Sequence, residues 1–148
     1  MNLKRLLSSD SILLDLQGTT KDEIIAEMID FLVAKGRIKD RDAALKAVLE
    51  REQKMSTGMQ HGIAIPHGKT DSVDKLVTAL AIKKDGVDFG SMDGKPSRIF
   101  VMTVSPASRT GPHIQFLSEI SQILNDVEKR DSLLAAETPA QVVEILSL

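Results

Sequence analysis

The chain of 148 residues contains no cysteine, tryptophan or tyrosine, and phenylalanine occurs only four times. The absence of cysteine excludes a disulfide framework, a thiolate metal site and a cysteine nucleophile. Four Phe rings offer little for stacking nucleobases or sugars. No apolar run approaches the roughly 20 residues of a membrane span, and the N-terminus has no signal-peptide pattern. These absences favour a soluble cytoplasmic protein.

The chain also lacks a strong charge of either sign. Its formal net charge is -2, whereas a nucleic-acid binder normally carries a clear basic surplus. We therefore expect no nucleic-acid partner. Hydrophobic residues make up 42% and charged residues 27%, which is ordinary globular composition. The length fits one compact domain with a real core, and we expect that single domain over residues 1–148.

The first third of the chain carries clear helix signals after a short strand. Residues 11–16 contain an aliphatic run of strand length. Thr20 and Glu23 form a capping-box pattern, and apolar residues then repeat at helical spacing until Gly36 closes the helix. Asp40 is placed to cap a second helix. This part of the sequence predicts a strand followed by two helices.

The second half begins with strands. Residues 76–83 and 98–105 are short and aliphatic, and residues 84–86 and 92–95 carry Asp-Gly pairs that predict turns between them. Pro112 suits the first position of a helix. The predicted buried face of that helix consists of Ile114, Leu117, Ile120, Ile123 and Leu124, with Phe116 beside it.

Two more helices are predicted, one around residues 128–136 and one capped by Thr138. The order is then one strand, two helices, three or four strands and three helices. Such an order predicts an α/β fold, a three-layer α/β/α sandwich around a mixed sheet.

One stretch in the middle combines a strand signal with a reactive side chain. The apolar run of residues 63–65 stops at Pro66, which has no backbone N–H and ends sheet pairing. His67 and Gly68 follow at once. Because Gly68 has no Cβ, a bulky group on His67 has room near the backbone. The pattern predicts a buried strand whose end presents an imidazole into open space.

A neutral imidazole nitrogen is a competent nucleophile toward phosphorus. Catalysis of phosphoryl transfer is mostly positioning and electrostatic stabilisation of the phosphoryl oxygens. Arg51, in the last turn of the second predicted helix, offers a bidentate fork for two such oxygens. Ser56, Thr57 and the amide near Gly68 are further candidate phosphate ligands. His113 follows Pro112 in a first helical turn, where the dipole favours a neutral ring and the N–H groups bind anions.

These motifs together resemble a known family. Arg51-Glu52, Ser56-Thr57-Gly58 and the run from Gly62 to Gly68 are similar to the type-2 enzyme IIA domain of the bacterial phosphotransferase system. The resemblance covers essentially the whole chain. It implies that His67 accepts a phosphoryl group from the histidine phosphocarrier protein HPr or its nitrogen-branch relative. His113 and Arg51 match the second histidine and the arginine of the family's site, and no cofactor or metal is implied.

Within the family, we expect a nitrogen-regulatory role, with a regulated kinase or transporter as a further partner. The chain length without a fused transporter and the residues around His67 favour this role. The alternative is a detached fructose- or mannitol-type component that passes phosphate to a IIB domain. One departure from the family's pattern lies in the loop: Gln60 stands where the family usually has Gly, and His61 occupies a variable polar position.

Two hypotheses come from other classes. A metal-dependent hydrolase would use His61, His67 and His113, but their spacing does not match His-Glu-x-x-His and no carboxylate is placed as a ligand or base. A purely regulatory binding module of the same fold would make partner contacts without phosphoryl flux. Phosphorylation of the histidine separates this module from a carrier.

Overall fold

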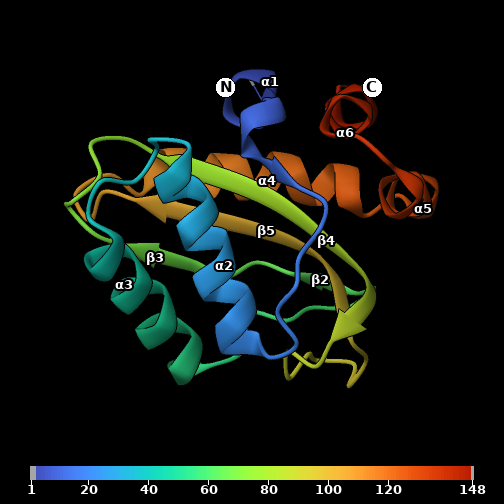
Figure 1. The fold of residues 1–148 in the computed structure, drawn as a ribbon, viewed down its shortest axis with the longest axis horizontal. Coiled ribbons are helices and arrows are strands. Elements are labelled where there is room, and N and C mark those ends of the chain that lie inside the picture. Colours follow the sequence, from blue (N-terminus) through green and yellow to red (C-terminus); the bar gives the residue numbers. More distant parts are fainter. Residues whose placement is uncertain (1–2, 148) are drawn as a thin grey trace.

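A five-stranded mixed sheet lies between two layers of helices in the computed structural model, which describes residues 3–147 (Figure 1). Residues 1, 2 and 148 of the predicted domain lie outside that range. The strands are β1 (Ile12–Leu13), β2 (Ile63–Ala64), β3 (His67–Lys69), β4 (Val77–Val87) and β5 (Ser97–Ser105). The helices are α1 (Leu3–Leu6), the 3-10 helix η1 (Ser9–Ser11), α2 (Lys21–Ala34), α3 (Arg41–Lys54), α4 (Gly111–Leu124), α5 (Val127–Ala135) and α6 (Pro139–Leu146).

The two layers of helices enclose two separate cores. One core lies between the sheet and the α2–α3 layer, and the other lies between the sheet and the layer of α4, α5 and α6. Strand β5 serves both, because Phe100 and Met102 join the first core while Ile99 and Val101 join the second. A strand covered on both faces is apolar at nearly every position. The predicted three-layer sandwich around a mixed sheet is confirmed.

Strands β2 and β3 are two halves of one edge strand. Both run parallel to β5, with Ile63 opposite Ile99 and His67 opposite Thr103, so the register is the same on either side of the gap. The carbonyl of Pro66, inside the gap, accepts from the Thr103 N–H at 3.2 Å. The expectation that the strand stops at Pro66 is therefore wrong. A proline on an edge strand removes only a donor that the neighbouring strand does not need.

The predicted helix caps are confirmed. Thr20 and Glu23 form the capping box of α2, and the Asp40 side chain accepts from the Ala43 N–H at the start of α3. Thr138 caps α6 in a second capping box. Each cap satisfies backbone donors that a helix leaves free at its first turn. The sequence alone therefore located three helix starts.

Two local predictions are wrong. Ile114 was expected in the buried face of α4 but is 63% exposed, whereas Phe116 is fully buried. The helix is rotated relative to the predicted face because His113 and Phe116 point inward together. Residues 84–86 do not end the strand: β4 continues to Val87, with a shift of register in its pairing with β5 between Ile82 and Val87.

Gly68 lets α3 pack directly against β3. A Cβ on Gly68 would lie 2.8 Å from the Ala47 carbonyl carbon and 2.8 Å from the Val48 nitrogen, closer than real Cβ atoms come. Both atoms belong to the backbone of α3, one turn before Arg51. The close approach of helix and strand therefore fixes the helix end that carries Arg51 relative to His67.

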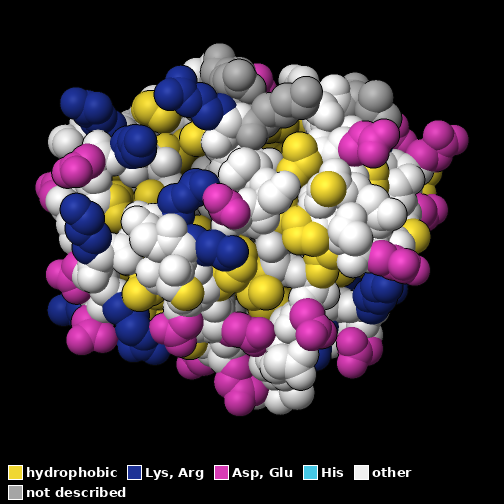
Figure 2. Space-filling view, turned by 45° about the horizontal axis from the view of Figure 1, so that its top comes forward, with side chains coloured by type: hydrophobic (Ala, Val, Ile, Leu, Met, Phe, Trp, Pro, Cys, Tyr) yellow, Lys and Arg dark blue, Asp and Glu magenta, His cyan; other side chains and the backbone are white. Residues whose placement is uncertain are grey.

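The surface carries both signs of charge. On the face that Figure 2 brings forward, Lys and Arg side chains lie mainly on the left half, whereas Asp and Glu side chains lie at the left edge, along the lower edge and on the right, and hydrophobic side chains lie between them. Among residues 3–147, no helix combines the length and the apolar character that crossing a bilayer takes.

Candidate active site

Among residues 3–147, the imidazole of His67 has one hydrogen-bond partner, a backbone carbonyl. Its Nδ1 lies 2.8 Å from the carbonyl oxygen of Ile65, two residues earlier. A carbonyl only accepts hydrogen bonds, so Nδ1 carries the proton and donates. In the neutral ring Nε2 therefore keeps its lone pair. The ring is only half-buried, at the start of β3.

His113 lies beside His67, as the sequence predicted. It comes from the first turn of α4, and the two ring centroids are 5.1 Å apart with the planes tilted by 36°. The residue is only 8% exposed. Its Nδ1 lies 2.9 Å from Oγ1 of Thr103, the β5 residue that pairs with His67. The two histidines thus form a pair at the end of β5, from segments 46 positions apart.

Both rings are held in the neutral form. Burial is the largest influence on His67 and lowers its pKa, the Ile65 carbonyl raises it, and the Arg51 charge lowers it further. Burial, then the charges of His67 and Lys69, lower the pKa of His113 to about 4. Desolvation disfavours the charged form of an imidazole. Near pH 7, His67 is therefore a neutral ring with a free Nε2.

Arg51 lies in the last turn of α3, as predicted. Its Nη1 donates to the carbonyl oxygen of Met55 at 2.9 Å, which caps the end of the helix. In the described part of the chain Arg51 forms no ion pair, since Glu50 pairs with Lys46 and Glu52 with Lys21. The guanidinium is close enough to lower the pKa of His67. A cation without a carboxylate partner next to a neutral imidazole suits an incoming anion.

A buried carboxylate that the sequence interpretation missed organises the neighbouring loop. The Glu52 side chain is 3% exposed and accepts from the Thr57 N–H at 2.8 Å, from the Thr57 hydroxyl and from Lys21 Nζ at 3.0 Å. An acidic residue at the negative end of a helix is unfavourable without partners. The position of Glu52 in the last turn was the signal that could have revealed this role.

The loop links Glu52 to His67 through the backbone. The Thr57 carbonyl accepts from the Ile65 N–H at 3.1 Å, and the Ile65 carbonyl accepts from Nδ1 of His67. The Ser56 hydroxyl donates to the Phe89 carbonyl. The hydroxyls of Ser56 and Thr57 are thus engaged within the protein.

Gly68 faces α3. The hydroxyls of Ser56 and Thr57 already have partners within the protein, so phosphate binding by Ser56, Thr57 and Gly68 stays a prediction.

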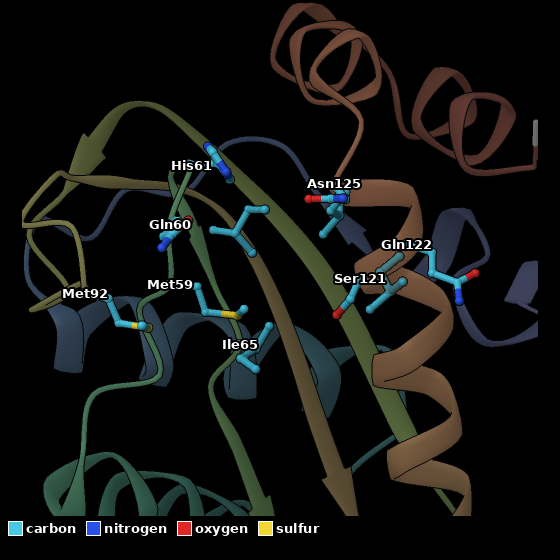
Figure 3. A pocket seen from close by; sticks show the side chains of 11 residues that line it. Met59, Gln60, His61, Ile65, Met92, Ser121, Gln122 and Asn125 are labelled. Carbon is cyan, nitrogen blue, oxygen red and sulfur yellow. The ribbon is translucent and has the colours of Figure 1, made fainter.

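The third histidine lies elsewhere. His61, with a φ of 65°, occupies an exposed turn, and with Gln60 it lines a separate cavity of about 430 Å³. In Figure 3, Met59 and Ile65 lie on one side of that cavity, opposite the last turns of α4. The unusual Gln60-His61 pair therefore shapes this cavity. Within residues 3–147, no three side chains of the metal-binding types His, Cys, Asp or Glu come together, so the three histidines do not form the cluster that a hydrolase needs.

Comparison with known families shows which family the chain belongs to. Residues 5–148 match the family described as "Phosphoenolpyruvate-dependent sugar phosphotransferase system, EIIA 2". The chain belongs to this family. It is accordingly an EIIA component, a phosphotransferase that acts as a phosphohistidine carrier.

Two curated relatives of this EIIA chain are fructose-specific. The chain is 43% identical over 128 residues to the fructose-specific EIIA component of Haloferax volcanii, covering 86% of this chain and 83% of the relative. It is 37% identical to the fructose-specific EIIABC component of Bacillus subtilis, where it matches 99% of this chain but spans only 23% of the relative.

Solved structures of both branches share the fold. The nitrogen regulatory protein IIA-Ntr of Neisseria meningitidis superposes with a TM-score of 0.89 at 26% identity, covering 97% of this chain and 98% of that one. The mannitol enzyme IIA of Escherichia coli, solved in complex with phosphorylated enzyme IIB, gives 0.82 at 26% identity, covering 95% and 96%.

Replacing Glu52 tests its role in holding the loop of the EIIA chain. Glu52→Ala leaves the Thr57 N–H, its hydroxyl and Lys21 without their acceptor, and we expect it to lower the free energy of unfolding by about 3–5 kcal/mol. Urea denaturation measures this loss. Glu50→Ala is the matched control, because its pair with Lys46 is exposed and should change stability by less than about 0.5 kcal/mol. Equal effects of the two changes would refute the role of Glu52.

The lowered pKa of His113 predicts a pH dependence of stability. The unfolded chain takes up a proton near pH 6.5, but the folded chain does so only near 4. Protonation in this window favours unfolding, so stability is fully present above pH 6.5 and falls as the pH drops toward 4. The loss is on the order of 2–3 kcal/mol. Denaturation curves from pH 7 to 4 measure it, and His113→Gln should remove this component. Parallel pH profiles for the two proteins would contradict the assignment.

Proposed function

We propose that this EIIA chain carries the phosphoryl group on Nε2 of His67. The observation that carries the proposal is the hydrogen bond from Nδ1 to the Ile65 carbonyl, which leaves Nε2 as the free nucleophile. The lowered pKa of the ring keeps that lone pair unprotonated near neutral pH. The match over residues 5–148 supports a single EIIA domain over that range.

The transfer itself is one displacement at phosphorus. The lone pair on Nε2 of His67 forms the new N–P bond while the bond from phosphorus to the donor's imidazole breaks, and that electron pair returns to the donor ring. The proton on Nδ1 stays in place. Because the Ile65 carbonyl accepts from that N–H, it stabilises the positive charge that the ring acquires. The reverse displacement passes the group on.

Two neighbouring groups suit the phosphoryl oxygens. Arg51 has no carboxylate partner in the described part of the chain and brings a positive charge to the site. His113, 5.1 Å away between ring centroids, stays neutral and offers a ring nitrogen. Preorganised donors of this kind stabilise the charge of a transferring phosphoryl group.

A fructose-type role is better supported than the nitrogen-regulatory role that the sequence wording favoured. Identity to the fructose-specific component of Haloferax volcanii is 43%, against 26% to the Neisseria nitrogen regulatory protein. We propose a histidine phosphocarrier protein of the HPr type as donor and a IIB domain as acceptor. The complex of the mannitol IIA with its IIB is the precedent.

Phosphorylation in a reconstituted system tests the carrier role. With phosphoenolpyruvate, enzyme I and HPr, we expect the chain to gain one acid-labile phosphate, measured by intact-protein mass spectrometry. His67→Ala should abolish the gain because it removes the nucleophile. His61→Ala, a histidine change outside the site, should not. Normal phosphorylation of the His67→Ala protein would sink the proposal.

The acceptor distinguishes the two branches. The phosphorylated chain, mixed with a fructose-type IIB domain, should lose its phosphate to that domain within the time of the assay. If the chain keeps its phosphate in the presence of the IIB domain, and is phosphorylated faster by the nitrogen-branch carrier than by HPr, the regulatory role is favoured instead. A chain that binds partners but takes no phosphate from either carrier would be a pure binding module.

A further inference from the structure

Thr103 contacts both halves of the histidine pair. Its backbone N–H donates to the Pro66 carbonyl at 3.2 Å, directly before His67, and the residue lies opposite His67 in the parallel register. Its Oγ1 lies 2.9 Å from Nδ1 of His113. No other residue that the structure describes hydrogen-bonds to that imidazole nitrogen.

The direction of the Thr103–His113 hydrogen bond follows from burial. Thr103 is 1% exposed, and a buried O–H group that finds no acceptor costs free energy. Within residues 3–147, Oγ1 of Thr103 has one hydrogen-bond partner, Nδ1 of His113. Thr78, the β4 residue opposite, gives its own hydroxyl to the Leu6 carbonyl and does not compete. The Thr103 hydroxyl therefore donates, and Nδ1 of His113 accepts.

We propose that Thr103 is a positioning residue that fixes the tautomer of His113, so that His113 presents an N–H to the phosphoryl group on His67. A neutral imidazole that accepts at Nδ1 carries its proton on Nε2. The inference rests on the proposed function, because the N–H of His113 acts on a phosphoryl group that His67 carries.

The tautomer decides whether His113 attracts or repels the phosphoryl group. An N–H at Nε2 donates to a phosphoryl oxygen and stabilises its negative charge. A lone pair at Nε2 would instead repel that oxygen, because both are electron-rich. Nε2 of His113 has no hydrogen-bond partner among the described residues and is free for this donation. The Ile65 carbonyl thus leaves Nε2 of His67 with a lone pair, and the Thr103 hydroxyl leaves Nε2 of His113 with an N–H.

The tautomer is measurable without any phosphate. Imidazole nitrogens with and without a proton have different ¹⁵N chemical shifts, so NMR of the unphosphorylated protein reads them directly. In the unaltered protein, we expect the proton of His113 on Nε2. Thr103→Val keeps the shape but removes the hydroxyl, and the Nε2–H form should lose population. Thr103→Ser should retain it. A proton on Nδ1 of His113 in the unaltered protein would overturn the proposal, whatever the variants do.

The functional consequence is a slower transfer at an intact site. We expect Thr103→Val to be phosphorylated on His67 still, but about tenfold to a hundredfold more slowly, the size of effect seen for residues that orient metal-bound histidines. Thr78→Val is the matched control, because it removes a buried threonine hydroxyl from the neighbouring strand without contacting His113. It should be phosphorylated at nearly the rate of the unaltered protein.

A double variant separates tautomer control from general loosening of the sheet. In a His113→Ala background, Thr103→Val should slow phosphorylation no further, because the ring that it orients is absent. An equal slowing with and without His113 would overturn the positioning role. Failure of the carrier role gives a different result: no phosphate would then reach His67 in any of these proteins, while the tautomer of His113 would still read out by NMR.

Discussion

The site depends on one hydrogen bond, from Nδ1 of His67 to the carbonyl of Ile65. This bond spans Pro66, and the backbone hydrogen bonds of residues 65 and 66 hold it in place. The Pro66 carbonyl stays in the ladder with β5, and the Ile65 N–H donates to the Thr57 carbonyl. Glu52 in turn holds Thr57. A buried carboxylate in a helix is thus linked, through the backbone of Thr57 and Ile65, to the contact that decides which nitrogen of His67 stays free.

The electrostatics of the site favour neutral imidazoles beside a cation. Burial lowers the pKa of both histidines, so both rings are neutral near pH 7 and Arg51 is a positively charged group beside them. Arg51 in turn lowers the pKa of His67 further. Burial of the second ring has a cost, because the folded protein resists protonation that the unfolded chain accepts. The same arrangement that prepares the site for an anion makes the fold sensitive to acid.

Local signals in the sequence were enough for the helix starts. The caps at Thr20, Asp40 and Thr138 depend on residues within one turn, and these were predicted correctly. The resumption of the strand after Pro66 was missed because pairing with β5 is non-local. The rotation of α4, which buries Phe116, was missed because tertiary packing sets it.

Two further residues of the site, Glu52 and Thr103, were missed because a sequence pattern does not show which hydrogen-bond partners a side chain has. Glu52 follows Arg51 in the last turn of α3, and Thr103 lies within the apolar strand β5. A carboxylate at the wrong end of a helix and a hydroxyl in a strand buried on both faces each need a partner. These two anomalies are readable in a sequence, but their partners are not.

The most direct test of the account is to identify the nitrogen that receives the phosphate. Protein labelled with ¹⁵N in its histidine rings, phosphorylated through HPr, shows a one-bond coupling between phosphorus and the nitrogen that bears it. The account predicts this coupling at Nε2 of His67, with Nδ1 still protonated. A coupling at Nδ1 of His67 would contradict it, because that nitrogen would have to abandon the Ile65 carbonyl.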